Sequence, residues 1–187
     1  MNYKKLIIIA VCAIWVVVLG VLAFLPGVEV SDKQIEDRML YNKISNATYK
    51  ICFENNPEEY KKVELPTDRG EVKEQMAFYI TVCNLLKEKN ILMDKSETDS
   101  IATAEYESML TDEQQATFRE ALFKVLQKEN ISKEKYLELA CEIAYYKYNS
   151  FNLEKDFEHT EYDQKAEEDF DTQFKEYVED NMPFSLF

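Results

Sequence analysis

Few side chains in this sequence are of the types that carry catalysis. His159 is the only histidine, and no Ser-His-acid order can be assembled around it convincingly. The chain has only three glycines, and no glycine-rich loop of the kind that holds phosphates is present. We therefore expect no catalysis and no bound cofactor, and we interpret His159 as a surface residue.

The most acidic segment suggests a calcium site at first sight. Its closest carboxylates are Glu167, Glu168, Asp169 and Asp171. A calcium loop requires a turn and oxygen ligands at set spacings, whereas these residues lie within an expected helix. We interpret them as a solvated outer face and expect no metal.

Cysteine offers little further chemistry. After the first 28 residues the chain contains Cys52, Cys83 and Cys141, an odd number that cannot pair completely within the chain. No spacing resembles a zinc site. Their places on apolar stripes favour buried thiols, and their redox state stays open.

Contact with another polypeptide is the remaining possibility, and two sets of side chains are candidates. The candidate peptide-binding residues are Met76, Tyr79, Tyr145, Tyr146, Tyr148 and Phe151. The candidate partner-docking residues, along one edge of the last expected helix, are Tyr162, Phe170, Phe174 and Tyr177. Stripes at helical spacing also build ordinary cores, so this alternative stays open for both sets.

The composition favours helices as the elements that position these side chains. Glycine and proline together number only seven, while strong helix formers such as Glu, Lys and Leu are plentiful. All 36 acidic residues follow residue 28, whereas two of the 22 basic residues, Lys4 and Lys5, precede it. Such an acidic surface repels phosphates, which disfavours nucleic-acid binding.

An uncharged apolar run from Leu6 to Leu25 decides where the rest of the chain lies. Its twenty residues are long enough to cross a bilayer as a helix, and Lys4 and Lys5 place the N-terminus in the cytoplasm. The alternative, a cleaved signal peptide, would have a shorter apolar region and an Ala-x-Ala-like site. We expect a retained single-pass anchor.

After the anchor we expect an all-α ectodomain of about six helices. Four helix starts are predicted from capping residues: Ser31 with Gln34, Ser96, Thr111 with Gln114, and Ser132. Two helices are predicted to stop at an asparagine in the left-handed conformation followed by isoleucine: Asn90–Ile91 and Asn130–Ile131. The segment from Pro57 to Gly70 is predicted as a hinge or variable loop.

The longest helix is predicted to run from Ser132 to about Glu158. Its inward residues are expected to be Leu137, Ala140, Cys141, Ala144, Tyr148 and Phe151. A last helix is expected from about Glu161 to Asp180. The domain boundaries are therefore residues 1–5 in the cytoplasm, 6–25 in the membrane, 26–30 as connector, 31–158 as helical domain and 159–187 as acidic helix and tail.

Part of this pattern resembles a known family. The segment Leu85 to Asp94 reads Leu-Leu-Lys-Glu-Lys-Asn-Ile-Leu-Met-Asp, and it is followed by Phe118, Leu122, Asn130, Ile131, Ser132, Glu134 and Tyr136. Residues 31–157 thereby resemble the helical chaperone domain of SurA and PrsA-type foldases, which is similar to the C-terminal domain of trigger factor. Asn90 and Asn130 stand where that family usually has glycine.

The resemblance implies a cradle of helices that holds unfolded polypeptide outside a bacterial membrane. The parvulin isomerase domain that often accompanies it is not expected, because the short acidic segment after Phe157 leaves no room for a mixed sheet domain. The alternative is a scaffold or signalling subunit that docks on a membrane protein through its acidic C-terminal helix. Self-pairing through the anchor has no support from a Gly-x-x-x-Gly pattern. The oligomeric state stays open.

Overall fold

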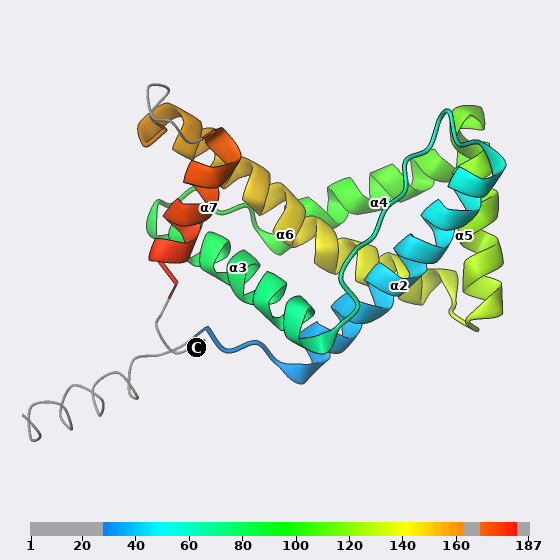
Figure 1. The fold of residues 1–187 in the computed structure, drawn as a ribbon, viewed down its shortest axis with the longest axis horizontal. Coiled ribbons are helices and arrows are strands. Elements are labelled where there is room, and N and C mark those ends of the chain that lie inside the picture. The colour runs from blue at the N-terminus through cyan, green and yellow to red at the C-terminus, as the bar shows by residue number, and fades with distance from the viewer. Residues whose placement is uncertain (1–27, 163–168, 183–187) are drawn as a thin grey trace, which may run out of the picture.

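The computed structural model describes residues 28–162 and 169–182. In chain order its elements are α2 (Asp32–Asn55), α3 (Arg69–Glu88), α4 (Lys95–Thr111), the 3-10 turn η1 (Glu113–Gln115), α5 (Ala116–Lys128), α6 (Lys133–Thr160) and α7 (Phe170–Asp180) (Figure 1). All regular structure within these ranges is helical, which confirms the all-α prediction. None of the helices described is long and apolar enough to cross a membrane, and the expected anchor, residues 6–25, lies outside the described ranges.

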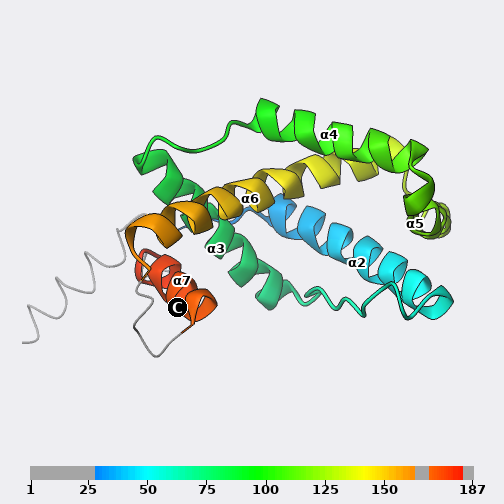
Figure 2. The same cartoon turned by 90° about the horizontal axis from the view of Figure 1, so that it is seen from above.

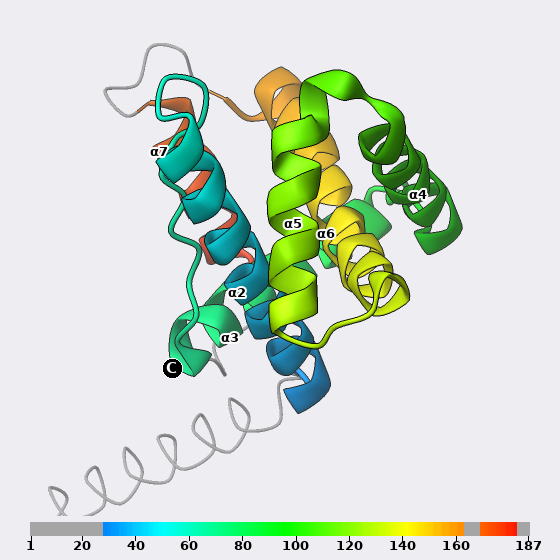
Figure 3. The same cartoon turned by 90° about the vertical axis from the view of Figure 1, so that its right-hand side faces the viewer.

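Helix α6 is the element around which the others are arranged. It contacts α2, α3, α4 and α7, and Figure 2 shows α4 along one of its sides and α3 crossing on another. Helix α5 packs mainly against α2, as Figure 3 shows. The acidic C-terminal helix, expected from about Glu161, is α7 in the structure, where it begins at Phe170 and packs on α3 and α6 of the same chain.

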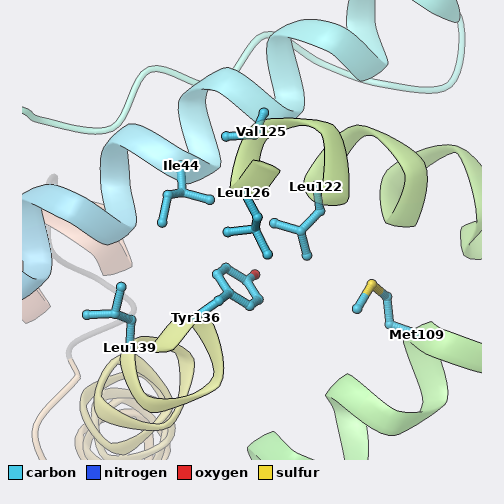
Figure 4. Close-up of a cluster of buried hydrophobic side chains, with 7 residues drawn as sticks. All are labelled: Ile44, Met109, Leu122, Val125, Leu126, Tyr136 and Leu139. Carbon is cyan, nitrogen blue, oxygen red and sulfur yellow. The ribbon is translucent and has the colours of Figure 1, made fainter. Parts of the chain in front are cut away.

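Three apolar clusters join the helices. The first joins α2, α4, α5 and α6 through Ile44, Met109, Leu122, Val125, Leu126, Tyr136 and Leu139 (Figure 4). The second joins α3, α6 and α7 through Val82, Leu85, Leu86, Leu153, Phe157, Phe174 and Val178. The third joins α2, α3 and α6 through Ile35, Val72, Met76, Cys83 and Tyr146.

Two of the four predicted helix starts are confirmed. The Ser31 hydroxyl accepts from the Gln34 amide at 3.3 Å, and the Gln34 side chain accepts from the Ser31 amide at 3.0 Å. The Ser132 hydroxyl accepts from the Lys135 amide at 3.1 Å. Both serines thus satisfy amides that the first helical turn leaves without intrahelical partners.

The other two predicted starts are wrong, because an aspartate takes the position instead. Asp94 caps α4 by accepting from the Glu97 amide at 2.9 Å, and Ser96 lies inside the first turn. Thr111 is the last residue of α4, and Asp112 caps η1. A carboxylate beside the exposed amides is the stronger acceptor there. Asp68 likewise caps α3, which begins at Arg69.

Both predicted helix stops are confirmed. Asn90 and Asn130 have φ values of 58° and 54°, and the amides of Ile91 and Ile131 donate to the carbonyls of Leu86 and Leu126 at 3.0 and 2.9 Å. These are the bonds of a Schellman motif. Ile131 packs on the first cluster, whereas the side chain of Ile91 stays 42% exposed.

The predicted inward face of α6 is wrong by one residue. The buried side chains include Tyr136, Leu139, Tyr146, Ser150, Leu153 and Phe157. Leu137, Ala140, Cys141 and Tyr148 are half-buried, Phe151 is 52% exposed, and only Ala144 of the predicted set is buried. One residue corresponds to a rotation of about 100°, and a helix flanked by four others buries side chains on several faces.

The connector between α2 and α3 runs along α2. The Asn42 amide donates to the Pro66 carbonyl at 2.7 Å, and the Asn46 side chain both donates to the Leu65 carbonyl and accepts from its amide, at 2.9 and 2.8 Å. The segment that sequence patterns indicate as a hinge is therefore hydrogen-bonded to α2 at two successive residues.

Asn149 fastens the connector between α3 and α4 to the middle of α6. Its side chain has no exposed surface. Its Oδ1 accepts from the Met93 amide at 2.9 Å, and its amide nitrogen donates to the Met93 carbonyl at 3.3 Å and to the Tyr145 carbonyl at 2.9 Å. The path of the chain from α3 to α4 is therefore set by one side chain of α6.

We expect Asn149→Ala to lower the free energy of unfolding by about 1–3 kcal/mol, because the polar groups of Met93 lose their partner. Urea unfolding of the protein in detergent, followed by far-ultraviolet circular dichroism, measures the change. Asn84→Ala, at an exposed position of α3, is the control and should change the value by less than about 0.5 kcal/mol. Equal effects of the two substitutions would contradict the role of Asn149.

We expect Asn130→Gly to preserve or raise the free energy of unfolding, and Asn130→Ala to lower it by about 1 kcal/mol. The reason is that the left-handed conformation strains a residue with a Cβ, and asparagine tolerates it better than alanine. The same urea titration measures both variants. A more stable alanine variant would show that the positive φ value carries no cost.

Candidate functional site

The six candidate peptide-binding residues do not form one surface. Met76 is only 1% exposed and Tyr146 only 6% exposed, so the prediction that these two side chains contact a client is corrected. Both belong to the cluster that joins α2, α3 and α6. A spacing of three or four residues marks one face of a helix but does not show whether that face is covered.

Tyr79 and Tyr145 belong to the aromatic packing around Tyr146. The rings of Tyr79 and Tyr146 stack with centroids 5.7 Å apart, and the Arg38 guanidinium lies 5.3 Å from the Tyr79 centroid. Tyr145 meets Tyr146 edge to face at 5.4 Å. Burial and the neighbouring Cys83 raise the pKa of Tyr145 to about 12, so the Tyr145 hydroxyl stays protonated at neutral pH.

Tyr148 and Phe151 lie outside the aromatic packing around Tyr146. The Tyr148 hydroxyl donates to the Glu105 carboxylate of α4, and burial with this bond raises the pKa of Tyr148 to about 12. Phe151 is exposed, with the Lys155 ammonium 4.3 Å from its ring centroid. The aromatic run on α6 is therefore distributed over several sides of the helix.

The four candidate docking residues surround a residue of their own chain. The ring centroids of Tyr162, Phe170, Phe174 and Tyr177 lie 6.4, 5.6, 5.5 and 5.1 Å from that of Phe157 on α6. Phe174 is only 7% exposed. The prediction of a free docking edge is thus corrected: these rings attach α7 to α6 and α3.

One residue from each candidate set lines a shared cavity, which we name the α3–α6–α7 cleft. Its volume is about 490 Å³. It is lined by Phe78 and Tyr79 from α3, by Lys147, Ser150 and Glu154 from α6, and by Asp171, Phe174 and Lys175 from α7. Its walls are aromatic, because Phe78 meets Tyr79 and Phe174 edge to face at 6.0 and 6.4 Å.

Ser150 is the side chain that distinguishes this cleft. The residue is 8% exposed, and its hydroxyl oxygen is buried without a hydrogen-bond partner in the part of the chain that the structure describes. A buried hydroxyl without a partner costs about 1–3 kcal/mol. A serine within a helix usually bonds to the carbonyl four residues earlier, and here it does not.

Sequence reasoning missed Ser150. The only sequence feature that could have indicated Ser150 is its place as a polar residue beside the aromatic run of α6. This feature is not specific, since serines within helices often bond to a carbonyl of their own helix. The cleft depends on the position of α7 against α3 and α6. No local pattern in α6 contains that information.

Two carboxylates from different helices face the cleft. Burial raises the pKa of Glu154 above 4.5, and the charge of Asp171 raises it further. Neither carboxylate forms an ion pair or a hydrogen bond among the described residues. The cleft therefore combines aromatic walls with two carboxylates that have no ion-pair partner among the described residues.

A second cavity, of about 190 Å³, lies where α2, α4, α5 and α6 meet. Tyr41, Tyr106, Phe118 and Tyr136 are among its lining residues, and the Tyr106 hydroxyl has no partner there. None of the candidate residues predicted from sequence lines it. The larger α3–α6–α7 cleft, which contains Tyr79 and Phe174, is the better candidate.

We expect Glu154→Gln to raise the free energy of unfolding at neutral pH. An acid whose pKa is higher in the folded state makes folding less favourable as the pH rises above its usual pKa, and this loss persists at neutral pH. The gain should shrink as the pH falls and should vanish below 4.5, where Glu154 is protonated in both the folded and the unfolded state. Urea titrations at several pH values measure it, with Glu176→Gln as the control outside the cleft; a gain independent of pH would contradict the assignment.

No family model, curated protein or solved structure matches the chain. The resemblance of residues 31–157 to the chaperone domain of SurA and PrsA-type foldases stays a prediction. The geometry of the α3–α6–α7 cleft is therefore the basis for the proposed function.

Proposed function

We propose that the chain is a membrane-anchored module that binds unfolded or extended polypeptide without catalysis, and that part of this polypeptide enters the α3–α6–α7 cleft. The observation that carries the proposal is the aromatic-walled cleft, in whose wall the Ser150 hydroxyl lies buried without a partner among the described residues. An extended peptide offers what this cavity lacks, namely backbone carbonyls that accept hydrogen bonds and apolar side chains that fill aromatic walls.

The volume supports a polypeptide segment. A space of about 490 Å³ lies within the range of roughly 300–1,000 Å³ that is usual for ligand sites. Binding a segment of a few residues here requires no fixed sequence, since a hydroxyl recognises any backbone carbonyl. A module for diverse clients needs this tolerance.

The chemistry of the cleft favours binding over nucleophilic catalysis. A serine nucleophile must be activated by a general base within hydrogen-bond reach. In the described part of the chain, no hydrogen bond joins the Ser150 hydroxyl to a base. The Ser150 hydroxyl therefore has no activating group among the described residues.

The proposed location follows from the apolar run of residues 6–25. We propose that it anchors the protein in a bacterial cell membrane with the N-terminus in the cytoplasm. The helical domain then faces outwards, where unfolded segments of exported proteins would be its clients.

We expect a photo-crosslinking amino acid at Lys175, on the rim of the cleft, to capture a chemically unfolded client, whereas the same amino acid at Glu176 should not. Lys175 lines the cleft and Glu176 is exposed elsewhere on α7. Adding Ser150→Ala should weaken capture about fivefold, since one hydrogen bond contributes about 1 kcal/mol, with no loss of stability.

The outcomes of this experiment separate the two candidate functions. Capture of many unfolded clients at position 175 supports the proposed binding module. Capture of one folded membrane protein at position 176 supports the scaffold or signalling subunit. Equal capture of unfolded clients at both positions would overturn the assignment of the cleft.

A further inference from the structure

The unpaired charge of the α3–α6–α7 cleft is negative, although two lysines also line it. The Lys175 ammonium lies 3.6 Å from the Glu179 carboxylate, one turn along α7. The Lys147 ammonium lies 5.2 Å from the ring centroid of Tyr148 on α6, which is not among the lining residues. Both cations are therefore engaged by groups outside the cleft.

The two carboxylates have no comparable partner. Glu154 is half-buried on α6, Asp171 is exposed on α7, and both residues line the cleft. Two like charges at the same cavity repel each other, and a cation between them relieves that repulsion. Ser150, four residues before Glu154 on the same helix, also lines the cleft, and its buried hydroxyl has no partner among the described residues.

A metal ion is a poor fit for this charge. No group of three or more His, Cys, Asp or Glu side chains is arranged to hold a metal within the described residues, and calcium takes six to eight oxygen ligands. The walls are instead aromatic, and aromatic rings attract ammonium and guanidinium groups as well as apolar side chains.

We infer that the α3–α6–α7 cleft selects polypeptide segments in which a lysine or arginine stands beside an apolar residue. The cation is placed between Glu154 and Asp171, the apolar side chain contacts Phe78 and Phe174, and the Ser150 hydroxyl donates to a carbonyl of the segment. This inference rests on the proposed function, because it names the kind of polypeptide that the same site takes.

The net negative charge of the whole chain also favours the binding of cationic segments. The chain carries a formal net charge of −14, and a field of this sign draws cationic segments towards the surface and repels acidic ones. This long-range attraction falls with salt, and every acidic residue on the surface contributes to it. The local preference of the cleft must therefore be tested with variants that hold the total charge constant.

The test uses three fluorescent peptides of one sequence, Gly-Ser-Phe-X-Leu-Ser-Gly with X as Lys, Gln or Glu. They are titrated against the full-length protein in lipid nanodiscs, and binding is followed by fluorescence anisotropy. We expect the Lys peptide to bind roughly fivefold more tightly than the Gln peptide and the Glu peptide to bind most weakly.

Two double variants separate the local from the overall charge. E154Q with D171N should abolish the advantage of the Lys peptide while leaving the Gln peptide bound. E176Q with D180N removes the same charge from exposed positions of α7 outside the cleft and should leave most of the advantage in place.

Each outcome tests either the charge selectivity of the cleft or the proposed polypeptide-binding function. Equal binding of the Lys and Gln peptides would overturn the charge selectivity and leave the proposed function standing. Equal loss of the advantage in both double variants would also overturn it, since the overall charge would then explain the preference. No binding of any peptide would overturn the proposed function itself.

Discussion

The hydrogen bonds of Asn149 are the constraint on which the arrangement of the helices depends. This fully buried amide holds both polar groups of Met93, between α3 and α4, against the middle of α6. Because the connector is fixed there, α3 packs on one side of α6 and α4 follows another (Figure 2). The next residue, Ser150, is also buried but has no partner. Adjacent polar residues on one helix thus have opposite states, because Asn149 is satisfied by the fold and the Ser150 hydroxyl has no partner among the described residues.

The aromatic residues of the C-terminal part explain how the cleft forms. The four rings around Phe157 attach α7 to α6, and aromatic pairs in such geometry contribute about 0.5–1.5 kcal/mol each beyond their buried area. With α7 held there, Phe174 meets Phe78 of α3 and completes the wall. The residues that suggested a docking edge therefore build the candidate site from inside the molecule.

The features that sequence reasoning predicted correctly are local ones. The capping box at Ser31 and the left-handed stops at Asn90 and Asn130 each depend on fewer than seven consecutive residues, so the local chemistry decides them. The caps at Asp94 and Asp112 were missed because two suitable side chains compete within a few residues. The inward face of α6 was missed because its apolar positions are spread around the helix, and only the neighbouring helices decide which of them are covered. The cleft was missed for the same reason, since it requires α3, α6 and α7 together.

The composition of the cleft indicates weak and reversible binding. One hydroxyl donor, two carboxylates at an open rim and a short aromatic wall together offer a few kcal/mol, because ion pairs near water contribute at most about 1 kcal/mol each. A single segment would then dissociate quickly. If residues 6–25 hold the domain at a membrane as proposed, a client emerging there meets it at high local concentration, and repeated binding of successive segments compensates for the weakness of each. Low affinity at each site then permits release, which a module for folding chains requires.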